Sequence, residues 1–207
     1  LTKKKLLGEI NCIYKINDAS KSINILSNEF IKGNNDLDIV INDKKIDFSK
    51  EYHFSNKGDY SVKFQIYSEL NMTKMFNFCS SLTSLEFPNN FITENVEDFS
   101  GMFASSTKIN GLNLKNFNTK NAKNMANMFY YCNSLKSLSY NFNTDNVENM
   151  SGLFEATPLT SVDLSQFNTK KVTDMSRMFA DCYFLKSLDL SSFDTEQVKN
   201  MSLMFKS

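Results

Sequence analysis

The sequence predicts an α+β repeat protein: a solenoid with one short strand and one short helix in each unit of about 25 residues, preceded by a small all-β sandwich-like module. Three observations support this fold class. A Met-Phe or Leu-Phe pair recurs at intervals of 25 to 27 residues, each unit combines helical with strand-like spacing of apolar residues, and the first 70 residues show only strand-like alternation. One such unit cannot bury its own apolar stripe, so neighbouring units are expected to stack.

The recurring pair marks the half of each unit that is expected to be helical. It stands at Met75-Phe76, Met102-Phe103, Met128-Phe129, Leu153-Phe154, Met178-Phe179 and Met204-Phe205. In the clearest unit Val172, Met175, Met178 and Phe179 have the spacing i, i+3, i+6 and i+7. This spacing places the four side chains on one stripe of a short helix.

The other half of each unit is expected to be a short strand. Leu188-Asp189-Leu190 and Val162-Asp163-Leu164 alternate apolar and polar residues, as a half-buried strand does. A step of Phe, Asn or Asp, and Thr follows the strand, as in Phe167-Asn168-Thr169. Its polar side chains accept hydrogen bonds from nearby amides, which predicts a turn that forms the N-cap of the next helix.

The segment before Met72 shows no trace of the repeat. Apolar residues alternate over Ile10 to Ile16, Leu37 to Ile41 and Val62 to Ile66, which predicts several short strands in a small β-sandwich. Residues 52–64 are similar to the last hairpin of extracellular Ig-like domains. We therefore expect a first module at 1–70, serving as an N-terminal cap, and a repeat array of five to six units at 71–207, the last of them incomplete.

The repeats resemble those of a known family. From Val172 to Thr195 the chain follows the pattern VxxMxxMFxxCxxLxxLxLSxFxT at nearly every defined position, which is similar to the leucine-rich repeats of BspA-like surface proteins. The resemblance covers Met72 to Ser207 and implies a curved, leucine-rich-repeat-like solenoid displayed at a cell surface. Some units depart from the pattern: Ser106 and Thr157 replace its Cys, and the Glu155 to Pro158 segment is one residue shorter.

The strands suggest a candidate binding face. Side chains between the core leucines point away from the core, and they are small or acidic, so an extended protein partner could lie along them. For any single residue a merely solvated sheet face is the better explanation. The candidate residues are Ser84, Glu86, Asn113, Ser137, Ser139, Ser161, Asp163, Ser187 and Asp189.

Other kinds of chemistry find little support. Lys plus Arg equals Asp plus Glu at 23 each, so no basic excess draws the chain to nucleic acid. No apolar run is long enough to span a bilayer. The chain has one His and no zinc or phosphate-binding motif, so we expect no catalytic residue, no metal site, no cofactor and no enzyme activity.

Two features, N-glycosylation triplets and cysteines in register, would matter in a protein of the cell surface. Asn71, Asn149 and Asn200 begin N-glycosylation triplets, which matter only in a eukaryotic secretory route. Cys79, Cys132 and Cys182 share a register, but they are two units apart. At about 10 Å their Cα atoms exceed the roughly 7 Å limit for a disulfide, so we expect three free, buried thiols.

Two functions remain open. The first is a non-catalytic protein of the cell surface or the secreted fraction that mediates adhesion or binds a host, matrix or neighbouring surface protein, with its signal or anchor outside this segment. The second is a structural or scaffold protein that assembles with itself or with other chains. An adhesin should stay monomeric and bind a foreign protein, whereas a scaffold should form oligomers without one.

Overall fold

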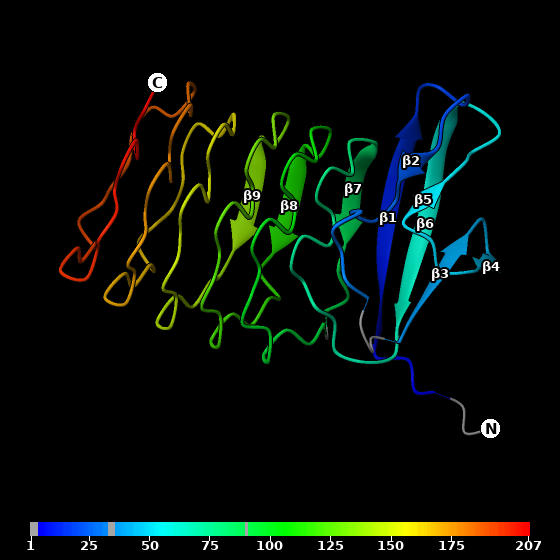
Figure 1. Cartoon of the computed structure of the whole chain (residues 1–207), viewed down its shortest axis with the longest axis horizontal. Helices are drawn as coiled ribbons and strands as arrows, with labels where there is room; N and C mark the ends of the chain where they lie inside the picture. Colours follow the sequence, from blue (N-terminus) through cyan, green and yellow to red (C-terminus); the bar gives the residue numbers. More distant parts are fainter. Residues whose placement is uncertain (1–3, 33–35, 90) are drawn as a thin grey trace.

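The computed structural model describes residues 4–32, 36–89 and 91–207. These residues form an elongated molecule with the N-terminal strands at one end (Figure 1). From β7 onward, successive turns of the chain lie side by side toward the C-terminus. We number the units of this part by their Met-Phe or Leu-Phe pairs, from unit 1 at Met75-Phe76 to unit 6 at Met204-Phe205.

The largest sheet is antiparallel and has the strand order β4-β3-β6-β1-β7. Its strands are β1 (Gly8–Ile16), β3 (Leu37–Ile41), β4 (Lys44–Ile46), β6 (Gly58–Ile66) and β7 (Leu82–Glu86). A separate antiparallel pair joins β2 (Ile23–Asn24) and β5 (Glu51–Tyr52). Alternate residues of β1, β3 and β6 are buried, because successive side chains of a strand point to opposite faces.

The hairpin between β3 and β4 has a two-residue turn. Asn42 and Asp43 both have left-handed backbone, with φ of 51° and 59°, and Ile41 faces Lys44 across the turn. Two consecutive left-handed residues are typical of a type I′ turn, whose twist matches that of the strands. Asn and Asp tolerate this conformation better than most residues.

Strand pairing joins the N-terminal strands to unit 1. β7 lies after the first Met-Phe pair in the sequence, yet it pairs with β1, so that Cys12 faces Leu85 and Asn11 faces Glu86. β1 is therefore hydrogen bonded to β6 on one side and to β7 on the other. The expected domain boundary at residue 70 stays a prediction, and the main sheet extends across it.

The predicted fold class, an α+β solenoid with a short helix in each unit, is wrong. No described residue lies in a helix, and most of the strand pairing is antiparallel. Beyond β7, the described units contain only two strands, the parallel pair β8 (Gly111–Leu114) and β9 (Ser137–Tyr140). Units 4 and 5 follow a similar path without assigned strands.

Left-handed residues explain why the helices are absent. In unit 5, Arg177 has φ of 56° and Asp181 has φ of 54°. A left-handed residue interrupts the right-handed run that an α-helix needs. Equivalent residues with positive φ stand before and after the pair in the other units: Lys74 and Phe78, Gly101 and Ser105, Asn127 and Tyr131, Gly152 and Ala156, and, before the last pair, Leu203.

Backbone amides in these segments bond to the next unit. The amides of Gly152, Phe154 and Ala156 donate to the carbonyl oxygens of Ser176, Met178 and Ala180 over 2.8 to 3.0 Å. The residues between them close tight turns, as where the Leu153 amide donates to the Met150 carbonyl at 3.2 Å. Three-residue turns thus produce the spacing that we interpreted as helical, and only a neighbouring unit can satisfy the remaining amides.

The Phe-Asn-Thr sequence that we expected to form an N-cap, at Phe167-Asn168-Thr169, has another role. Thr169 is buried, and its hydroxyl donates to the Asp194 carbonyl at 2.8 Å and accepts from the Asp194 amide at 2.7 Å. The Asn168 side chain accepts from the Lys170 amide at 3.2 Å, closing an Asx turn. The prediction of a turn is confirmed here, whereas the helix that it was to cap does not exist.

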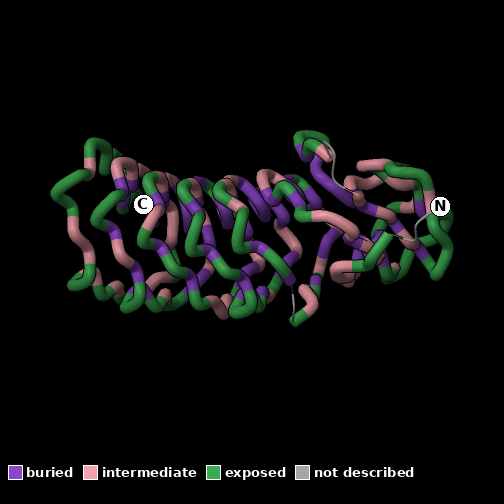
Figure 2. Tube along the Cα trace, turned by 90° about the horizontal axis from the view of Figure 1, so that it is seen from below, coloured by how far each residue is buried: buried purple, intermediate pink, exposed green. Residues whose placement is uncertain are grey.

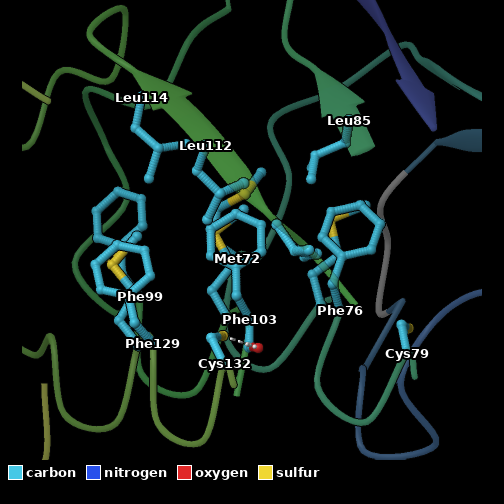
Figure 3. Close-up of a cluster of buried hydrophobic side chains, with 14 of the residues drawn as sticks. Met72, Phe76, Cys79, Leu85, Phe99, Phe103, Leu112, Leu114, Phe129 and Cys132 are labelled. Carbon is cyan, nitrogen blue, oxygen red and sulfur yellow. Dashed lines mark hydrogen bonds between the residues drawn. The ribbon is translucent and has the colours of Figure 1, made fainter. Parts of the chain in front are cut away.

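A stack of phenylalanine rings runs along the units, and it lies in the core except for its last ring, Phe205, which is 57% exposed. Phe76, Phe103, Phe129, Phe154, Phe179 and Phe205 lie in sequence, each ring parallel to the next within 13°, with centroids 5.7 to 6.0 Å apart. Phe64 of β6 meets Phe76 edge-on at 5.9 Å. Figure 2 shows buried positions recurring from turn to turn along the molecule, and Figure 3 shows Phe76 and Phe103 beneath Leu85 and Leu112.

Candidate functional site

A hollow on the strand side of units 3 and 4 has a volume of about 920 Å³. We call it the strand-face groove. It is bounded by β9 and the residues that follow it, by the segment 159–163 and Gln166 of unit 4, and by Lys115 of unit 2. Its lining is mostly polar, and its apolar and aromatic members are Leu138, Tyr140, Phe142, Leu159 and Val162.

The groove lies where unit 3 is one residue short. Units 2, 4 and 5 place two residues between the last strand Leu and the corner Phe, as in Leu114-Lys115-Asn116-Phe117, whereas unit 3 has only Tyr140-Asn141-Phe142. The missing residue leaves space beside Lys115 and Gln166, both of which line the groove. Tyr140 also stands where units 2, 4 and 5 have Leu.

Tyr140 shapes the wall of the groove. Its ring stacks on Phe142 with centroids 4.8 Å apart and meets Phe167 edge-on at 5.9 Å. Its hydroxyl donates to the Asp163 carbonyl oxygen at 2.5 Å and so bridges units 3 and 4. Burial, followed by the nearby Asp163 charge, raises the pKa of Tyr140, so the hydroxyl stays protonated and remains a donor.

Charges of both signs surround the groove. Hydrogen bonds from Asn168 and then Asn143 lower the pKa of Asp145, and a hydrogen bond from Ser165 lowers that of Asp163. Both carboxylates are therefore ionised at neutral pH. Lys115 and Lys136 lie on the same lining, and both are exposed. The groove can thus accept and donate hydrogen bonds and pair with either charge.

The structure brings four of the nine predicted binding-face residues together. Ser137, Ser139, Ser161 and Asp163 line the groove. The other five lie outside it and are exposed: Ser84, Glu86, Asn113, Ser187 and Asp189. Asn113 and Asp189 use their side chains to accept the amides of Lys115 and Ser191 at 3.2 and 2.9 Å.

Sequence reasoning missed Tyr140, Asn141, Asn143 and Asp145 as lining residues. The available signal was a comparison of units: the Tyr at a Leu position and the single residue before Phe142 both mark unit 3 as different. The pattern of outward strand residues alone treats all units alike. It could therefore not locate a hollow that depends on one shortened corner.

The three glycosylation triplets have similar local geometry. The side chains of Asn71, Asn149 and Asn200 accept the amides of Thr73, Ser151 and Ser202 at 2.9 to 3.1 Å. Asn71 and Asn200 are exposed, whereas Asn149 is half-buried between the parallel bridges to Asn124 and Asp174. Modification of these triplets requires a eukaryotic secretory route.

No helix in the described part of the chain has the length and hydropathy of a membrane span. Among residues 4–32, 36–89 and 91–207, no group of three or more His, Cys, Asp and Glu side chains is placed to hold a metal ion.

Comparison with known proteins gives one match. The family model described as "Mycoplasma protein of unknown function, DUF285" matches residues 47–158 and 139–207, which together span more than half of the chain. No curated protein and no solved structure matches. The family description assigns no ligand or reaction, so the function is argued from the groove.

Proposed function

This chain belongs to the DUF285 family of Mycoplasma proteins of unknown function, and from that premise we propose that it is a non-catalytic, cell-surface protein that binds a partner protein in the strand-face groove. The observation that carries the proposal is the groove itself. It has a volume of about 920 Å³, and four residues of the expected binding face line it.

The lining suits a polypeptide partner. Ser137, Ser139 and Ser161 are small, so the main chain of a partner can approach closely and exchange hydrogen bonds with their hydroxyls. Lys136 and Asp163 offer both charges, which favours a partner with mixed polar side chains over a strongly charged polymer. The lining contains neither His nor Cys, so it supports binding better than acid-base or thiol chemistry.

The surface location is supported by the similarity of the units to BspA-like repeats, from Met72 to Ser207. Its test is treatment of intact cells of the source organism with trypsin and with an antibody to this chain, using a cytosolic protein as control. We expect cleavage and labelling without lysis. Protection of the chain until the cells are lysed would contradict the surface assignment.

A pair of equivalent aspartates tests the groove. Asp163 and Asp189 occupy the same position in successive units, both are exposed, and both accept the amide two residues later. Only Asp163 lines the groove. We expect Asp163→Lys to weaken binding to immobilised host matrix proteins about tenfold, or ~1.4 kcal/mol, while Asp189→Lys binds like the natural chain.

Equal binding by both variants would place the contact outside the groove. Sedimentation of the purified chain separates the remaining alternative, because a binding module is expected to run as a monomer that shifts only when its partner is added. Oligomers formed without a partner would favour the structural or scaffold function.

A further inference from the structure

A second hollow, with no residue in common with the strand-face groove, lies where unit 4 is short. Its volume is about 390 Å³. We call it the aromatic notch. It is lined by Tyr131 and Asn133 of unit 3, Ala156, Thr157 and Pro158 of unit 4, and Asp181, Tyr183 and Phe184 of unit 5.

The notch results from one missing residue. Between the Phe of the pair and the next core Leu, unit 4 has one residue fewer than units 3 and 5. Ala156, Thr157 and Pro158 of the shorter segment line the notch together with residues of the longer segments of units 3 and 5. The aromatic side chains of those longer segments therefore face a gap instead of a neighbouring segment.

Three aromatic side chains that line the notch are exposed. Tyr183 is 70% exposed, Phe184 62% and Tyr131 47%. Single exposed aromatics are common, but three around one hollow mark a binding site. With Pro158, they make a set of flat, rigid surfaces on which other rings can stack.

Hydrogen-bonding groups accompany the rings. In the described part of the chain, the Tyr131 hydroxyl and the Asn133 side chain make no hydrogen bond, so both are available as donors. The Tyr183 hydroxyl donates to one oxygen of Asp181 at 2.9 Å. The other oxygen of Asp181 is 3.9 Å from Lys206, a long contact that a closer cation can replace.

We propose that the aromatic notch binds a proline-rich segment of a partner protein in the polyproline II conformation, with a basic residue beside Asp181. Such a segment has no internal hydrogen bonds, so its carbonyl oxygens need donors like those of Tyr131 and Asn133. Its proline rings pack on aromatic walls, which is how aromatic-lined grooves recognise proline-rich peptides. A guanidinium group adds a charged contact with Asp181 and stacking on Tyr183.

The test adds the whole chain, up to millimolar concentration, to each of three fluorescein-labelled peptides. Binding is measured as the rise in fluorescence anisotropy of the peptide. The probe has the sequence RPLPPLP, the second peptide has every Pro replaced by Ala, and the third has Glu in place of Arg. Tyr183→Ala removes a wall and Asp181→Asn removes the charge. Phe78→Ala is the matched control, since Phe78 is an exposed aromatic at the unit 1 position equivalent to Tyr131.

We expect saturable binding of the probe and at least tenfold weaker binding of both altered peptides. Tyr183→Ala should abolish binding, Asp181→Asn should weaken it for the Arg probe only, and Phe78→Ala should leave it unchanged. Equal binding of the Ala peptide, loss of binding in Phe78→Ala, or no binding at millimolar protein would overturn the proposal. So would tight binding of a galactose-terminated oligosaccharide that depends on Tyr183, which would assign the notch to glycans.

Discussion

Single residues in left-handed conformation determine the path of each unit. The position before the Met or Leu of the pair has φ between 54° and 60° in all six units, yet it is Gly only at Gly101 and Gly152. At the other four positions the residue has a side chain, which makes the left-handed conformation costly by about 1 kcal/mol. The amide at each of the first five positions donates to the next unit, and this bond offsets the cost.

The two glycines give the first prediction. Both have φ of 60°, so Ala at either position adds similar backbone strain of about 1 kcal/mol. A Cβ at Gly152 would lie 2.1 Å from Asn127 Oδ1, whereas one at Gly101 would meet the flexible Lys74 side chain at 3.1 Å. We expect Gly152→Ala to lower the free energy of unfolding, measured in urea, by about 1 kcal/mol more than Gly101→Ala.

The double variant Gly152→Ala with Asn127→Ala removes the colliding atom, and Asn127→Ala alone is its reference, because Ala at the left-handed position 127 adds a cost of its own. In that background Gly152→Ala should cost no more than Gly101→Ala does in the natural chain. Equal losses in the two single glycine variants would show that Asn127 turns away without cost.

One position in units 2 to 5 carries Cys, Ser or Thr, and its side chain donates a hydrogen bond to a backbone carbonyl oxygen. Cys132 Sγ donates to the Phe103 carbonyl at 3.0 Å, and Ser106 Oγ donates to the Phe76 carbonyl at 2.5 Å (Figure 3 shows the Cys132 bond). The replacement of the pattern's Cys by Ser106 is therefore conservative. The expected thiols are all unpaired, with Cys79 and Cys132 buried and Cys182 only half-buried.

At the scale of elements, buried threonines connect one corner to the next. Thr119, Thr144 and Thr169 each donate to a carbonyl of the following unit over 2.8 to 3.0 Å. Thr144 also accepts the Asn168 amide at 2.8 Å. Since Thr144 is only 1% exposed, water cannot easily take over these bonds if its hydroxyl is removed.

Thr144→Val is the second prediction, since it keeps the shape of the side chain and removes its hydroxyl. The Asn168 amide and carbonyl then lose their partner, so we expect a loss of about 2 kcal/mol in the free energy of unfolding. Thr144→Ser keeps the hydroxyl and loses one methyl group, at a cost of about 1 kcal/mol. Denaturation in urea measures both, and a larger loss for Ser than for Val would contradict the assigned role.

At the scale of the whole molecule, the N-terminal strands and the units share one continuous core. β1 pairs with both β6 and β7, and the contact of Phe64 with Phe76 joins the main sheet to the ring stack. Cys12 of β1, Cys79 of unit 1 and Cys132 of unit 3 are buried in this core. Continuity of packing predicts that these regions unfold together.

Thiol labelling in urea at pH 8 tests this cooperativity. Burial raises the pKa of Cys12, Cys79 and Cys132, the last to about 12, so at pH 8 they are almost entirely thiols and react slowly while folded. We expect Cys182 to react first, and the other three to become reactive at one common urea concentration. Two separate midpoints, one for Cys12 with Cys79 and one for Cys132, would show independent unfolding.

The sequence alone indicated much of the local pattern. It placed the apolar positions of units 1 to 6, the turn at the Asn or Asp before each Thr, and the strand-like alternation later seen in β1, β3 and β6. It also led to four groove residues, Ser137, Ser139, Ser161 and Asp163. These features follow from local periodicity and side-chain chemistry, which neighbouring residues of one segment share.

Only the tertiary structure decided how the amides of the Met-Phe segments are satisfied. The spacing of Val172, Met175 and Met178 fits a helix as well as a series of tight turns, and the turns prevail because the next unit supplies carbonyl acceptors for Arg177 and Phe179. The groove and the notch likewise depend on one short loop between two longer ones. A periodic sequence determines which side chains are buried, whereas contacts between units determine the backbone hydrogen bonds and the hollows.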